Sequence, residues 1–282
     1  MGRKVELEKH GIERRNTVLE VITLTPVLKG LIVITIAGLT FPLAGVYLFR
    51  LNLLPMRFML MHGAILGGAM ALAFQINTFW TTIGVNLLLV LFMARSSRIL
   101  KMDLGHISMF FMVITISLAF IFIYTFNVPA KDTMMILWGN LYVLTWVEVT
   151  GIGIFALCLV AFQYFFRSHL RALFFDREIA FTAGFNEGML YYAVIIIVAI
   201  TVALAMKLIG ALLLDAILLL PPVVASFHAR SLRGMITGSV MWGGIFAAGG
   251  FLLSIAIDIP ASSAVAAMAC VAFIVLYLFR KR

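Results

Sequence analysis

Charged residues and cysteines are scarce in this sequence. Charged side chains make up 12% of its 282 residues, roughly half the share of an ordinary soluble domain, whereas 63% of the residues are hydrophobic. The two cysteines, Cys158 and Cys270, lie inside apolar stretches and lack the spacing of a disulfide framework or a zinc knuckle. We therefore exclude a soluble globular domain and expect a membrane protein.

Motifs for chemistry are also missing. The sequence contains no G-x-x-x-x-G-K-[ST] phosphate loop, so any ATP hydrolysis must occur in a separate partner chain, which would hold the ATP and magnesium. An intramembrane enzyme would need a nucleophile with a base, or a metal motif such as H-E-x-x-H, and neither pattern is present. The chain is therefore predicted not to be an enzyme and to carry no cofactor of its own.

Long apolar runs fill most of the chain. Each is close to the roughly 20 residues that cross the hydrocarbon core of a bilayer as a helix. They predict an all-α polytopic bundle of eight or nine spans in the cell membrane, with a polar extension at 1–22 and a single permease-like domain at 23–282. Nine is the favoured count, at 28–50, 57–75, 78–96, 104–127, 143–166, 187–206, 208–228, 234–257 and 261–280.

Basic residues collect in alternate connections between these runs. They form no continuous stripe with interleaved aromatic residues, so nucleic acid is not an expected partner despite a net charge of +9. Cytoplasmic loops carry an excess of Lys and Arg, so all five clusters are predicted to be cytoplasmic. With nine spans the amino terminus then lies outside, or residues 1–22 form a cytoplasmic surface helix. The clusters are Arg50/Arg57, Arg95/Arg98/Lys101, Arg167/Arg171/Arg177, Arg230/Arg233 and Arg280/Lys281/Arg282.

One cytoplasmic connection, 167–188, is long enough to have a structure of its own. Its sequence, RSHLRALFFDREIAFTAGFNEG, combines a basic start, an acidic pair and small residues. It can form a short amphipathic helix on the cytoplasmic face. The segment is either a solvated connection with snorkelling basic ends or a docking element for a soluble partner.

Several motifs in this order resemble the permease subunits of ABC importers for zinc, manganese and iron. They are DREIAFTAG at 176–184, MKLIGALLLDAILLLPPVVAS at 206–226, Gly45 to Gly67, WGNLYVLT at 138–145 and SIAIDIPASS at 254–263. The resemblance covers nearly all the chain after about residue 23. It implies a type II ABC importer permease fold that moves a divalent transition metal across the membrane by alternating access.

The resemblance also implies three protein partners, in addition to membrane lipid. A cytoplasmic ATP-binding subunit would grip the segment 167–186, an extracytoplasmic substrate-binding protein would deliver the cargo, and a second permease chain would complete a homodimer or heterodimer. The residues expected to couple to the ATPase are Asp176, Arg177, Glu178, Ala180 and Gly184.

Ionisable groups inside spans are expensive and are therefore candidates for the transport path. The second span of the family typically carries D-x-x-x-H, which presents a carboxylate and an imidazole on one helix face. His62 matches the histidine, but Phe58 stands at the aspartate position. A metal chelate as cargo, or a second permease chain that supplies the aspartate, would accommodate this change. A non-transporting scaffold or sensor that kept the docking segment is a further alternative.

Four other positions complete the candidate set. Asp215 stands where the family usually has a small hydroxyl or apolar residue, and it either contributes to a metal site or pairs with a neighbouring span. We expect it about 10 Å from His62 in depth, as a successive station on the path. Glu148 would attract cations at the outer mouth, and Pro221 and Pro222 would kink a span at a gate or form a static bend.

Overall fold

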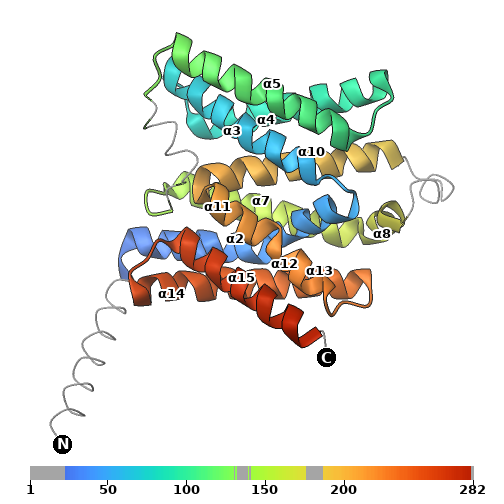
Figure 1. Cartoon of the computed structure of the whole chain (residues 1–282). Coiled ribbons are helices and arrows are strands. Elements are labelled where there is room, and N and C mark those ends of the chain that lie inside the picture. The colour runs from blue at the N-terminus through green and yellow to red at the C-terminus, as the bar shows by residue number, and fades with distance from the viewer. Residues whose placement is uncertain (1–22, 130, 132–138, 140, 176–186, 281–282) are drawn as a thin grey trace, which may run out of the picture.

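The computed structural model describes residues 23–129, 131, 139, 141–175 and 187–280. Within these ranges the chain is helical and contains no β-strand. Figure 1 shows the helices as a bundle of roughly aligned rods. The elements are α2 (Thr25–Arg50), α3 (Leu54–Phe74), α4 (Thr78–Leu100), α5 (Leu104–Thr125), α7 (Trp146–Phe165), α8 (Arg167–Phe175), α10 (Glu187–Ile209), α11 (Ala211–Leu218), α12 (Leu220–Ser226), α13 (Leu232–Gly244), the π-helix η1 (Ile245–Gly249), α14 (Gly250–Ile257) and α15 (Ala261–Arg280).

Eight helical stretches in the described ranges are long and apolar enough to cross a membrane. They confirm the all-α polytopic fold and match eight of the nine expected spans. The ninth expected span, 208–228, is present as the two short apolar helices α11 and α12, which are divided at Leu219 beside the two prolines. Together they cover 211–226, which is about 24 Å of helix and shorter than the hydrocarbon core.

The centre of the bundle is α2, which contacts α7, α10, α11 and α13. Its apolar sequence has no polar face, so the helix is buried around much of its circumference. Gly38 allows α13 to come close, because a Cβ there would lie 2.6 Å from the carbonyl oxygen of Gly243. Small residues at such crossings are typical of helices that pack inside membranes.

A second layer consists of α3, α4 and α5, which lie together at one side of the bundle in Figure 1. Gly63 and Gly67 of α3 face α4. A Cβ at Gly67 would lie 2.8 Å from the Cα of Thr82, and one at Gly63 would lie 2.2 Å from Oδ1 of Asn86. These contacts hold α3 at a fixed distance from α4 and so fix the position of His62.

The break between α11 and α12 follows from the two prolines. Pro222 has no N–H, so the carbonyl of Leu218 loses its partner within the helix. That carbonyl lies against Gly45 of α2, where a Cβ would come within 1.8 Å of its oxygen. Pro221 and Pro222 are buried in the first turn of α12. The prolines therefore mark a break packed against α2, and their role as a gate stays a prediction.

The connections with basic residues gather at one end of the bundle. Figure 1 shows α8, the connection from α12 to α13 and the carboxyl terminus at the same end. This arrangement is the one expected when successive spans alternate in direction. The described part of the chain thus fits the expected topology, in which this end faces the cytoplasm.

Candidate transport site

An ion pair joins two of the apolar helices, α3 and α11. Nη1 of Arg57, three residues after the start of α3, contacts Oδ1 of Asp215 in α11. The Arg57 guanidinium also lies over the ring of Phe58, 4.1 Å from its centroid. Of the two interpretations of Asp215 drawn from the sequence, this geometry matches the one in which Asp215 pairs with a neighbouring span.

The two partners of this pair differ in exposure. The Arg57 side chain is 5% exposed, whereas that of Asp215 is 40% exposed. Oδ1 of Asp215 is shielded on the side of Arg57, so the exposed part of the side chain lies on its other side. Arg57 lies behind the half-exposed carboxyl group of Asp215, so the pair presents a carboxyl oxygen at the surface of α11.

His62 lies further along α3, on the same helix face as Phe58. Its Nδ1 is 2.7 Å from the carbonyl oxygen of Phe58. Because a carbonyl oxygen can only accept, Nδ1 must carry the proton, which leaves the lone pair on Nε2. A histidine held by a second hydrogen bond in this way is a typical metal ligand. The same hydrogen bond is also expected of a histidine that has only a structural role and makes its hydrogen bond within its own helix.

Phe58 is 44% exposed and occupies the surface next to His62. It supplies no ligand atom, so the helix face offers one imidazole instead of a carboxylate and an imidazole. Among the described residues, no group of three or more His, Cys, Asp and Glu side chains is close enough to hold a metal ion. In the described part of the chain, His62 and Asp215 therefore belong to no such cluster, and their role as successive stations stays a prediction.

Glu148 lies at the start of α7, where both of its oxygens already have partners. Oε1 accepts a hydrogen bond from Nζ of Lys207 at 2.7 Å. Oε2 accepts from the backbone N–H and the hydroxyl of Thr145 at 2.8 and 2.9 Å, which completes a capping box. These contacts cap α7 and tie it to the end of α10. A role for Glu148 in attracting cations stays a prediction.

The segment predicted to dock an ATPase is described in its first part. Residues 167–175 form α8, whose apolar face buries Leu170, Leu173 and Phe174. This confirms a short amphipathic helix after α7. The remaining predicted coupling residues, Asp176, Arg177, Glu178, Ala180 and Gly184, lie outside the described residues.

Arg57 is the residue of the site that the sequence analysis did not identify. It was assigned to a cluster of topology-determining cations because it lies near the end of a span. One signal could have separated it from that cluster. A carboxylate in the middle of a span needs a cation within reach, and Arg57 lies inside its helix beyond Pro55, whereas Arg50 ends α2 and is exposed.

The chain is similar in sequence to curated proteins of about the same length. The chain is 27% identical over 230 residues to a protein of Haemophilus influenzae named "High-affinity zinc uptake system membrane protein ZnuB", which covers 79% of this chain and 85% of that protein. It is 23% identical over 253 residues to "Manganese import system permease protein ScaB" of Streptococcus gordonii, with 88% of each chain covered.

Two solved structures have the same fold. PsaBC from Streptococcus pneumoniae in complex with Fab superimposes with a TM-score of 0.80 at 18% identity, covering 93% of this chain and 95% of that one. An inward-facing putative metal-chelate type ABC transporter gives a TM-score of 0.72 at 19% identity, covering 89% and 85%. The model of the ABC 3 transport family matches residues 24–280. This chain is therefore a multi-pass cell-membrane protein and a permease subunit that belongs to the ABC 3 transport family.

Proposed function

We propose that the chain is the membrane-spanning subunit of an ATP-driven importer for a divalent transition metal such as zinc, manganese or iron. The observation that carries the proposal is the family match, which extends over almost the whole chain. Relatives named for zinc uptake and manganese import support the substrate class.

In this proposal Asp215 and His62 contact the cargo in turn. Asp215 offers a carboxyl oxygen on the side away from Arg57, and His62 offers Nε2. Carboxylate and imidazole groups are ligands that suit these metals. Because the described part of the chain supplies no three-ligand cluster, the remaining ligands come from water, a chelator or a second permease chain.

A metal chelate is the second candidate cargo, and Phe58 is the observation that favours it. Its exposed ring replaces a hard anionic ligand beside His62, and a cation covers the ring. The Phe58 ring does not attract a bare dication by charge, whereas the apolar part of a chelate could pack against the ring. One structural neighbour is itself named as a putative metal-chelate type transporter.

The proposed cycle needs partner chains. A cytoplasmic ATP-binding subunit would grip the segment that begins with α8, and an extracytoplasmic substrate-binding protein would load the path. Closure of two ATPases would move two such segments in a dimer of permease chains. The path between the chains would then open alternately to each side of the membrane.

The test is transport by the complex reconstituted in liposomes. The chain is purified together with its ATPase, and uptake of labelled zinc, manganese and iron, free and chelated, is measured with and without ATP. Asp215→Ala and His62→Ala should lower uptake of the accepted cargo. The matched controls are Asp258→Asn and His106→Ala, which alter exposed residues at the ends of helices and should leave uptake unchanged.

Other outcomes discriminate between the alternatives. Uptake of chelated but not free metal selects the chelate. Substrate-insensitive ATP hydrolysis without uptake of any cargo would indicate a scaffold or sensor. Absence of an associated ATPase would contradict the importer assignment itself.

A further inference from the structure

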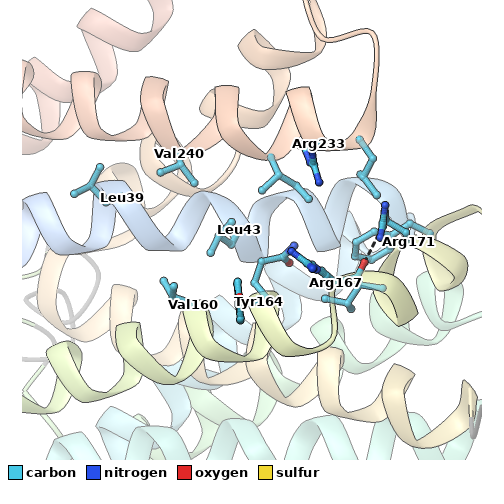
Figure 2. Close-up of a pocket in the computed structure, with 13 residues that line it drawn as sticks. Leu39, Leu43, Val160, Tyr164, Arg167, Arg171, Arg233 and Val240 are labelled. Atoms are coloured by element: carbon cyan, nitrogen blue, oxygen red, sulfur yellow. Dashed lines mark hydrogen bonds between the residues drawn. The ribbon is translucent and has the colours of Figure 1, made fainter.

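A groove crosses the surface of α2 at the basic end of the bundle. Both α7 and α13 pack against α2, and between them Leu39 and Leu43 form the floor of the groove. Val160 of α7 and Val240 of α13 line its two walls, as Figure 2 shows. The groove has a volume of about 360 Å³, within the range of pockets that bury small ligands. It is an apolar slot on a face of the bundle that lies in the membrane.

Three arginines close one end of this groove. Arg167 and Arg171 come from α8 and Arg233 from the start of α13, and all three are exposed. In Figure 2 they lie at the end opposite to Leu39 and Val240. Nε of Arg171 donates to the carbonyl of Arg167 at 3.1 Å, which fixes its direction. Among the described residues, none of the three forms an ion pair with a carboxylate.

The spacing along the two walls is the same. Val160 precedes Arg167 by seven residues, and Val240 follows Arg233 by seven residues. In α13 the seven residues rise about 10 Å, and the groove residues that follow Arg233, Ile236 and Val240, are apolar. On the other wall, Gln163 and Tyr164 lie between Val160 of α7 and Arg167 of α8. This pattern matches a molecule with an anionic head and an apolar tail.

A polar side chain marks the boundary between the two parts. Oε1 of Gln163 accepts a hydrogen bond from the hydroxyl of the buried Tyr47 at 2.7 Å. Gln163 lines the groove, and its amide nitrogen takes no part in the bond with Tyr47, so it can donate to another partner. A donor at this level suits the ester or phosphate oxygens of a lipid.

We propose that the groove binds one anionic phospholipid of the leaflet at the basic end. Its phosphate contacts Arg167, Arg171 and Arg233, and one acyl chain lies along the apolar walls. Guanidinium groups bind phosphate oxygens in a bidentate manner, and basic pockets between spans at the cytoplasmic side bind anionic headgroups. The lipid would tie α8 to α13, and so would hold the start of the predicted docking segment. The proposal does not depend on which solute the chain carries.

Native mass spectrometry of the full chain in detergent tests the proposal. The protein is titrated with phosphatidylglycerol, phosphatidylcholine or inorganic phosphate. The groove variant is the triple change Arg167→Gln, Arg171→Gln and Arg233→Gln. Each basic residue near an anionic membrane surface contributes roughly a fivefold factor, so the triple variant should bind phosphatidylglycerol at least about tenfold more weakly. Binding of phosphatidylcholine should be weak in both proteins.

The matched control removes the same charge from the same end of the bundle. Arg50→Gln, Arg95→Gln and Arg230→Gln alter three exposed arginines that do not line the groove. This variant should keep phosphatidylglycerol binding within about twofold, because its charges lie away from the groove and act only through long-range attraction. Val160→Trp fills the groove without any change of charge and should also lower binding.

Four results would overturn the proposal. The first two are an equal loss of phosphatidylglycerol binding in the two triple variants, and unchanged binding of this lipid by Val160→Trp. The other two are an affinity for phosphatidylcholine equal to that for phosphatidylglycerol, and complete competition by inorganic phosphate, which would indicate an anion site only. Displacement of the lipid by a purified ATPase subunit would instead assign the arginines to a protein interface. Val160→Trp keeps the test decisive if the triple variant does not fold.

Discussion

At the scale of single residues, Arg57 and Asp215 depend on each other. Each charge is costly at membrane depth, and their contact offsets part of that cost. Arg57→Gln leaves a carboxylate without its cation. Because Asp215 is partly exposed, we expect a loss of about 1–3 kcal/mol in the free energy of unfolding, between the values for surface and buried pairs. Thermal unfolding in detergent measures the loss.

A double-mutant cycle separates this pair from its surroundings. Arg57→Gln combined with Asp215→Asn should be more stable than Arg57→Gln alone, because no charge is left unpaired. Arg50→Gln, at an exposed helix end, provides the control and should change stability little. Strictly additive effects would show that the contact does not couple α3 to α11.

The cargo preference at His62 can be tested by restoring the missing carboxylate. Phe58→Asp creates a D-x-x-x-H pair on one face of α3. Changes around a metal ligand typically alter affinity by 10–100-fold, so we expect at least about tenfold tighter binding of a bare dication. Isothermal titration with zinc and manganese measures it.

Phe58→Asn is the control for the loss of the aromatic ring. Its affinity for the dication should increase much less, because asparagine adds no charge. A gain that persists in Phe58→Asp with His62→Ala would show that the histidine is not part of the site. A lower uptake of chelated metal in Phe58→Asp would support the chelate as natural cargo.

At the scale of elements, the break at Leu219 depends on the close approach of α2. Gly45→Ala would place a Cβ within 1.8 Å of the Leu218 oxygen, and this backbone cannot retreat as a flexible side chain can. Overpacking of this kind costs about 1–3 kcal/mol. We expect a lower thermal unfolding temperature in detergent.

Gly153→Ala provides the matched control, since it also lies within a membrane-spanning helix but a Cβ there meets nothing within 4 Å. It should be neutral or slightly stabilising, because alanine favours the helix. Equal destabilisation by both changes would mean that the contact with the Leu218 carbonyl does not determine the effect.

The elements also show how far the sequence alone could lead. Apolar runs and charged breaks determine where long spans begin and end, so eight spans were predicted within a few residues. The sequence did not predict that the stretch 208–228 is divided into α11 and α12. Two prolines can either kink a helix or divide it, and the contact with Gly45 determines which of the two occurs. The partner of Asp215 was missed for a similar reason, since Arg57 is distant in sequence and hydropathy does not report pairing between spans.

At the scale of the whole molecule, one surface carries the proposed path. Phe58 of α3 and Asp215 of α11 are both partly exposed, and Leu212, one turn before Asp215 in α11, is 50% exposed. In a dimer, this surface would line the space between the two chains, which is where alternating access would change exposure to water. Lipid-facing residues, by contrast, would stay dry in every state.

Thiol labelling measures directly how the exposure of a residue to water changes between the two states of the complex. Phe58→Cys is introduced after Cys158 and Cys270, which are both exposed, are changed to alanine. A charged maleimide added from the cytoplasmic side should react with it at a rate that differs at least severalfold between the nucleotide-free and ATP-trapped complexes. Ile154→Cys, at a 65% exposed position on α7, should stay unlabelled in both states, because hydrocarbon excludes the reagent. Equal labelling of Phe58→Cys in the two states would mean that α3 does not line a path that opens and closes, and Asp215 and His62 would then lose their place on it.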